Sequence, residues 1–62
     1  MPKTGTVKFF NETKGWGFIK ADEQDYFVHA SKLQDKITEG DEVVFEVKAT
    51  RRGNDAVDVR LK

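Results

Sequence analysis

The chain has 62 residues, so it has room for one small hydrophobic core, and we expect residues 1–62 to form a single domain. It contains no cysteine, which excludes disulfide bridges and zinc–thiolate sites and favours a reducing, cytoplasmic compartment. Eleven basic and eleven acidic residues cancel, which argues against a protein held to a polyanion mainly by long-range electrostatics. No apolar run exceeds three residues, so we expect neither a signal sequence nor a membrane segment.

The charges are unevenly distributed along the chain. Residues 1–20 carry four Lys and one Glu, a net charge of +3; residues 21–50 carry three Lys and eight acidic residues, a net charge of −5. Residues 51–62 carry four basic and two acidic residues, a net charge of +2. If the fold brings the two ends together, a basic face can exist on a neutral molecule; ordinary solvated surface charge explains the pattern equally well.

Short β-branched and aromatic segments, separated by turn residues, predict an all-β domain without long helices. In chain order, strands are expected over residues 4–10, 16–21, 26–30, 42–48 and 56–61. The connections between them are short except for residues 31–41, where Ser31 and Gln34 resemble a capping box and a single helical turn is plausible.

Alternation along the predicted strands assigns their two faces. It predicts a mostly aliphatic core made of Val7, Ile19, Val28, Leu33, Ile37, Val43, Phe45, Val47, Val57, Val59 and Leu61. The aromatic residues Trp16, Phe18 and Phe27 fall on the opposite face, with Lys20 and His29. Such a patch indicates a binding surface for a ligand with flat rings and an anionic backbone.

Phe9 and Phe10 are adjacent in one predicted strand and so point to opposite faces unless a β-bulge intervenes. We therefore expect either a bulge in this strand or one partly buried phenylalanine.

Two motifs on neighbouring predicted strands strengthen this interpretation. Residues 14–19, KGWGFI, follow the basic–Gly–aromatic–Gly–Phe–aliphatic pattern of the first ribonucleoprotein motif, in which alternate aromatic rings stack on bases. The glycine between the two rings removes a side chain on the core side, where a barrel wall curves. Residues 26–29, YFVH, supply the companion motif.

The sequence from Gly5 through these motifs to the last strand resembles the bacterial cold-shock proteins and the cold-shock domain. The resemblance implies a five-stranded antiparallel Greek-key barrel of the oligonucleotide-binding (OB) class. It also implies binding of single-stranded RNA or DNA with a pyrimidine preference, and a role as an RNA chaperone or a regulator of transcription or translation in the stress response. The expected chain is a cytoplasmic monomer and no enzyme, with no cofactor and no metal.

Carried over by position, the resemblance assigns base stacking and polar contacts to particular side chains. The stacking residues are Phe9, Phe10, Trp16, Phe18, Phe27 and His29. The polar contacts are Lys8, Asn11, Lys14, Asp25 and Arg52, and Lys20 joins them because alternation places it on the same face. For Asp25, a carboxylate that accepts from base N–H groups and an ordinary turn residue are equally consistent with the sequence.

Other interpretations of these residues stay open. Burial statistics alone favour a core position for Trp16, Phe18 and Phe27, although the double motif favours the surface. His29 with Glu12 or Asp25 would suit a small nuclease, but no nucleophile or metal cluster accompanies them. Residues 22–25 lack the ligand spacing of a calcium loop. The aromatic patch would also suit a proline-rich peptide.

The sequence departs from the family pattern in the third connection. Bacterial members commonly carry an aromatic residue after the histidine and another in a longer loop, whereas Ala30 follows His29 here and the loop is shorter. The stacking surface is therefore expected to be smaller than the family norm. Simple alternation places Ala30 on the core side of its strand, with Tyr26 and Val28.

Overall fold

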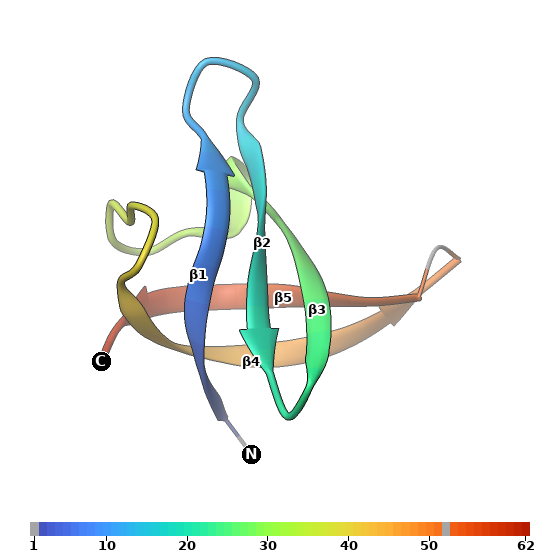
Figure 1. The fold of residues 1–62 in the computed structure, drawn as a ribbon. Helices are drawn as coiled ribbons and strands as arrows, with labels where there is room; N and C mark the ends of the chain where they lie inside the picture. The colour runs from blue at the N-terminus through green and yellow to red at the C-terminus, as the bar shows by residue number, and fades with distance from the viewer. Residues whose placement is uncertain (1, 52) are drawn as a thin grey trace.

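The computed structural model describes residues 2–51 and 53–62, which form a closed barrel of five strands. The elements in chain order are β1 (Lys3–Asn11), β2 (Trp16–Ala21), β3 (Gln24–His29), the 3-10 turn η1 (Ala30–Lys32), β4 (Glu42–Thr50) and β5 (Gly53–Leu61). β1, β2 and β3 stand side by side, and β4 and β5 cross behind them (Figure 1). No helix in the described part of the chain is long and apolar enough to cross a bilayer.

The strand order around the barrel is β1-β2-β3-β5-β4, and β4 closes the ring by pairing with β1. This arrangement confirms the five-stranded barrel and places all five strands where the sequence predicts them, with shifts of one to three residues at several ends. Four of the pairings are antiparallel. The β3–β5 pairing is parallel, which corrects the expectation of a wholly antiparallel barrel.

The core is a single cluster of mostly aliphatic side chains, as expected. Its buried members are Val7, Ile19, Ala21, Tyr26, Val28, Ile37, Val43, Phe45, Ala56 and Val59, and Phe10 and Leu33 pack against it. The Tyr26 ring contacts the Phe45 ring, with centroids 5.3 Å apart. Tyr26, Ala21 and Ala56 are therefore core residues that the predicted set omitted.

Three residues of the predicted core lie elsewhere, and the course of β5 explains the first. Val44 pairs with Arg60, but Glu46 pairs with Val57, so β5 contains one extra residue at this point. Asp58 lies within this bulge with a φ of 51°. The extra residue breaks simple alternation, so Ala56 and Val59 are both buried while Val57 is only half-buried.

The prediction that Val47 and Leu61 belong to the core is wrong, because few neighbouring residues pack over either side chain. The β4–β5 hairpin continues past β3 as a projecting tip (Figure 1), and Val47 begins the exposed part of β4. Leu61 is the last strand residue of the chain and is 47% exposed.

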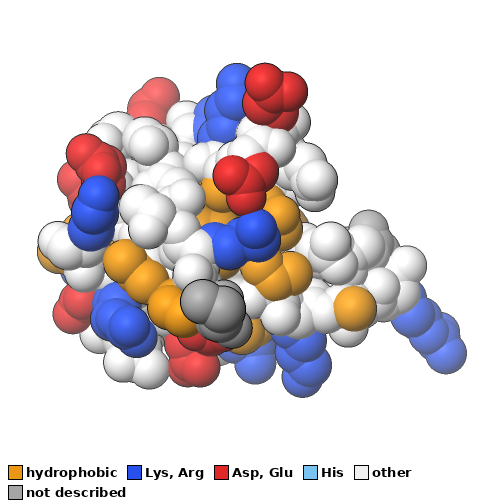
Figure 2. Space-filling model, turned by 90° about the horizontal axis from the view of Figure 1, so that it is seen from below, with side chains coloured by type: hydrophobic (Ala, Val, Ile, Leu, Met, Phe, Trp, Pro, Cys, Tyr) orange, Lys and Arg blue, Asp and Glu red, His pale blue; other side chains and the backbone are white. Residues whose placement is uncertain are grey.

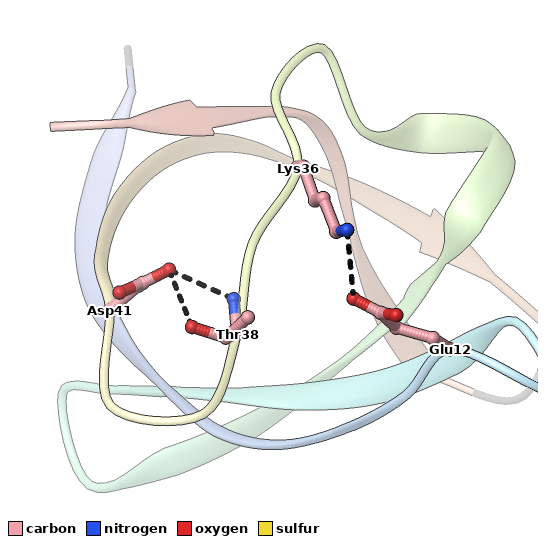
Figure 3. Close-up of polar contacts among 4 residues, drawn as sticks. All are labelled: Glu12, Lys36, Thr38 and Asp41. Atoms are coloured by element: carbon pink, nitrogen blue, oxygen red, sulfur yellow. Dashed lines mark hydrogen bonds and ion pairs between the residues drawn. The ribbon is translucent and has the colours of Figure 1, made fainter.

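The connection from η1 to β4 is held to the barrel at several points. Ile37 is fully buried, and the backbone N–H of Val7 donates to the carbonyl of Asp41. The Asp41 carboxylate accepts from the Thr38 backbone N–H at 2.8 Å and from its hydroxyl at 3.1 Å (Figure 3). Lys36 reaches the β1–β2 loop, with its Nζ 3.9 Å from Glu12 Oε1.

The single helical turn predicted in this connection is present as η1, but its cap differs from the prediction. His29 is the N-cap, and its side chain accepts a hydrogen bond from the Ser31 backbone N–H. Ser31 therefore lies inside the turn and not at its start. The Gln34 amide, the other half of the predicted capping box, donates to Asp58 on β5.

Candidate functional site

Four aromatic side chains from three adjacent strands form a continuous group on the outside of the barrel. We call Phe9, Trp16, Phe18 and Phe27 the aromatic cluster. Trp16 lies at its centre, with ring centroids 5.5 Å from Phe9, 5.7 Å from Phe18 and 6.2 Å from Phe27. Phe18 and Phe27 meet edge to face at 5.9 Å. None of the four is buried, and Phe9 is 41% exposed.

The register between β1 and β2 places Phe9 in this cluster. Val7 pairs with Ile19, but Phe9 pairs with Phe18, so the ladder shifts between Val7 and Phe9. This irregularity is the expected bulge, and it turns Phe9 outward while Phe10 packs against the core. The structure therefore separates Phe10 from the other stacking residues suggested by the sequence.

Gly17 permits the close approach of β1 that this register requires. Phe10 lies opposite Gly17 in the ladder. A Cβ atom built on Gly17 would lie 2.2 Å from the Phe9 carbonyl oxygen and 2.7 Å from Phe10 Cα. The second glycine of the motif thus lets β1 and β2 bring their aromatic side chains together.

His29 lies next to the cluster on β3, opposite Trp16 in the β2–β3 ladder. Its Nδ1 accepts from the Ser31 backbone N–H at 3.1 Å and lies 2.9 Å from Ser31 Oγ. Because Nδ1 accepts, a neutral ring carries its proton on Nε2, at the edge that faces away from Ser31. His29 is exposed and therefore open to a ligand.

Ala30 is exposed as the first residue of η1, so its expected place on the core side of β3 is wrong. Alternation fails here because the strand ends at His29 and the chain turns into η1. The Ala30 N–H donates to the Gly15 carbonyl, which holds this position against the β1–β2 loop beside Trp16.

The polar residues suggested by the sequence differ in their contacts within the protein. Lys8 and Asp25 form an ion pair, with Nζ 3.1 Å from Oδ2. Asn11 Oδ1 accepts from the Lys14 backbone N–H at 2.9 Å, so the Asn11 side chain shapes the β1–β2 loop. The side chains of Lys14 and Lys20 are exposed, and Arg52 lies outside the described residues.

A groove extends the aromatic cluster toward the start of β5. It has a volume of about 700 Å³ and is lined by Trp16, Phe18, Gln24, Asp25, Phe27, Gly53, Asn54 and Asp55. The sequence analysis did not predict Gln24, Asn54 and Asp55 as part of this site. Residues 53 and 54 are typical of a turn, but a turn motif does not indicate which surface of the fold the turn lies against. The β3–β5 pairing of Phe27 with Asp55 brings this hairpin to the cluster.

Charges of both signs are interspersed on the barrel surface seen from below, and hydrophobic side chains reach the surface between them (Figure 2).

Glu12 pairs with Lys36 and Asp25 with Lys8, so both carboxylates considered for a nuclease have basic partners. Within residues 2–51 and 53–62, no group of three or more His, Cys, Asp or Glu side chains is arranged to hold a metal ion.

A comparison with protein families shows which family this chain belongs to. Residues 3–62 match the model of the 'Cold-shock' DNA-binding domain. The chain belongs to the cold-shock domain family. This confirms the resemblance drawn from the sequence motifs and places the chain among nucleic-acid-binding domains, a family of binders and not of enzymes.

Bacterial relatives and a solved structure agree with this membership. The cold-shock domain is 43% identical over 60 residues to the major cold shock protein of Streptococcus pyogenes, with 89% of this chain and 90% of the relative covered. It is 44% identical over 62 residues to the cold shock-like protein CspA of Vibrio cholerae, covering 90% and 89% of the two chains.

Among solved structures, the cold-shock domain superposes on drosophila Unr CSD456 with a TM-score of 0.82 at 22% identity. The match covers all of this chain and 27% of the other, so the likeness concerns the fold of one domain within a longer protein.

Proposed function

We propose that this cold-shock domain binds single-stranded RNA or DNA by stacking unpaired bases on the aromatic cluster. The observation that carries the proposal is the position of four rings on the outer face of β1, β2 and β3, with Trp16 in contact with the other three. A small chain gains stability by burying such rings, so their exposure indicates a ligand. Bases paired in a duplex keep their faces covered, so only an unpaired strand offers them for stacking.

The side chains around the cluster fit the parts of such a ligand. We assign stacking to Phe9, Trp16, Phe18 and Phe27, with His29 at the margin. We assign phosphate contacts to the exposed Lys14 and Lys20, and further polar contacts to Lys8, Asn11 and Asp25. Phe10 contributes by supporting the bulge that turns Phe9 outward, and Arg52 keeps its assignment from the family resemblance alone.

We further propose a preference for pyrimidines and a role as an RNA chaperone or regulator of transcription or translation. Both follow from the family. A platform of four rings with few cations supports the chaperone role, because such a surface binds unpaired strands without the strong electrostatic attraction that would also hold duplexes.

Fluorescence of Trp16, the only tryptophan, tests this function directly. A heptamer of oligothymidine is expected to quench the emission, because a base stacked on the indole changes its surroundings. Oligoadenine should bind more weakly, and a blunt duplex should have little effect. Proline-rich peptide is the control for a protein-binding surface, and recovery of intact labelled RNA after long incubation tests for nuclease activity. Equal quenching by duplex and single strand would contradict the proposal.

The exposed position of Ala30 leads to an expectation for a larger platform. Ala30→Phe should place an additional ring beside the cluster and tighten binding of long oligothymidine about five-fold. This factor corresponds to a gain of ~1 kcal/mol, the low end of the range for one base stacked on an aromatic ring. The binding plateau should move to longer strands in a length series. Because Ala30 is exposed, the variant should keep the melting temperature of the original. Unchanged affinity in a normally folded variant would mean that no base reaches this position.

A further inference from the structure

A second groove lies between the connection that follows β3 and the outer side of β4 and β5. We call it the lysine groove; its volume is about 440 Å³, and it is lined by residues 31–34, Lys48, Val57 and Asp58. Two backbone contacts hold its walls together. The Gln34 N–H donates to the Val59 carbonyl at 2.7 Å, and Leu33 forms a parallel bridge with Val59. The groove is therefore formed by segments that are distant in sequence and fixed to one another.

Two lysines on different walls of this groove are available to an anion. Lys32 lies on η1 and Lys48 on β4, and both residues are exposed. Within the described part of the chain, the ion pairs between β1 and its neighbours, between Lys36 and Glu12, and between Lys62 and Glu42 involve neither lysine. An anion in the groove therefore does not have to displace a carboxylate from either cation.

The rest of the lining does not cancel this charge. Asp58 is the carboxylate of the lining, and its Oδ1 accepts from the Gln34 amide at 3.2 Å. Two lysines and one aspartate leave a net charge of +1. Leu33 and Val57 are half-buried and give the same groove an apolar surface. A nucleotide fits this combination, with its phosphate on the lysines and its sugar or base against the apolar side chains.

The lysine groove continues the aromatic cluster around the barrel. Lys48 pairs with Asp55 in the β4–β5 ladder, and Asp55 pairs with Phe27 in the β3–β5 ladder. Neighbouring strands are about 4.8 Å apart, so the backbones of Lys48 and Phe27 are separated by about 10 Å around the surface. A strand covers this distance in about three nucleotides, even at the duplex rise of ~3.4 Å per nucleotide.

We propose that the lysine groove binds the backbone of a single strand that continues past the aromatic cluster. This inference rests on the proposed function and adds a second part to the site: bases stack on the cluster, and the phosphates that follow contact Lys32 and Lys48. The two parts respond differently to salt. Stacking determines the affinity for a short strand, whereas the lysine groove adds affinity for a long strand, most strongly at low salt.

A comparison of tetrameric and decameric oligothymidine tests this extension. The tetramer matches the four rings of the cluster, and the decamer is long enough to reach the lysine groove as well. Between about 50 and 200 mM salt, the log–log slope for the tetramer should be about −1.4, for two phosphates at ~0.7 each. The decamer slope should be steeper by about 1.4, because two more phosphates are neutralised. The slope decides the question, since a longer strand also gains affinity from its larger number of binding registers.

Two substitutions assign the additional slope to the groove. Lys32→Gln and Lys48→Gln should each make the decamer slope shallower by about 0.7, which corresponds to binding weakened up to about five-fold at 0.1 M salt relative to 1 M. Neither should change tetramer binding, and both variants should keep the melting temperature because the residues are exposed. Lys62→Gln is the matched control. Lys62 is paired with Glu42 and lines neither groove, so the same loss of charge there should leave both slopes unchanged.

Amide chemical shifts locate the added contacts. The decamer should move the amide signals of residues 31–34 and Val57, and the tetramer should leave them in place. Equal decamer slopes in the Lys32, Lys48 and Lys62 variants would overturn the inference, as would decamer shifts confined to the aromatic cluster. If the tetramer does not quench Trp16, the proposed function fails; if it does and the decamer slope is no steeper, the lysine groove alone fails.

Discussion

Replacing Phe27 with alanine is expected to weaken binding of oligothymidine by about 1 to 3 kcal/mol, or roughly 5- to 150-fold in Kd. Phe27 lies nearly parallel to Trp16, with an interplanar angle of 20°, and meets Phe18 edge to face. Its loss removes one stacking surface and also leaves both neighbouring rings less constrained. The effect on binding should therefore exceed that of any substitution among the polar residues of the site, and titration of Trp16 fluorescence measures it.

Two comparisons separate binding from folding in this experiment. Phe18→Ala, which removes another ring of the cluster, should weaken binding by a similar amount. Val47→Ala removes an aliphatic side chain that is 36% exposed and lies outside the cluster, so it should leave affinity unchanged. If the two phenylalanine variants melt early but bind normally once folded, their rings are packing groups and the stacking surface is misassigned.

Gly17→Ala is expected to have the largest effect on stability. Its Cβ would lie within 2.2 to 2.7 Å of atoms of Phe9 and Phe10, including backbone atoms that cannot rotate away. Strands β1 and β2 would have to separate, at a cost of about 3 kcal/mol or more, the upper end for overpacking. A chain of this length has roughly 3 to 9 kcal/mol of stability at ~0.05–0.15 kcal/mol per residue, so this cost would remove between about a third and all of it. Urea denaturation followed by circular dichroism measures the loss.

Gly40→Ala serves as the control for this substitution. Gly40 has a φ of +92°, and nothing lies within 4 Å of an added Cβ, so alanine there adds backbone strain without a clash. The cost should be about 1 to 2 kcal/mol. If Gly17→Ala costs no more than Gly40→Ala, close approach of β1 is not the reason for glycine in the motif.

The sequence predicts the barrel well because turn residues and two-residue alternation mark all five strands. It misplaces core residues where this period is interrupted. The extra residue at Asp58 puts Ala56 and Val59 on the same side of β5, which a strict alternation cannot represent. Val47 and Leu61 fit the alternation of core residues, but both side chains are exposed. Alternation cannot predict this exposure, because it depends on where the neighbouring strands end.

The candidate site was predictable to a similar degree. Trp16, Phe18 and Phe27 follow from alternation within single strands, and the Phe9–Phe10 pair by itself indicated an irregular ladder. The Lys8–Asp25 ion pair and the groove at Asn54 were not predictable. They join strands that are distant in sequence, so they depend on the register of three strands and on the closure of the barrel.

The parallel β3–β5 contact has a consequence for aggregation. Among the described residues it pairs only Phe27 with Asp55 and Val28 with Ala56. This seam between β3 and β5 is shorter than the pairing of any other two strands in the barrel. Opening this seam would leave two strand edges with free N–H and C=O groups, which are templates for pairing with another molecule. Phe27 belongs to both the seam and the aromatic cluster, so a ligand stacked there binds the closed barrel in preference to the open one. Under the proposed function, an occupied surface would therefore protect the chain from self-association by mass action.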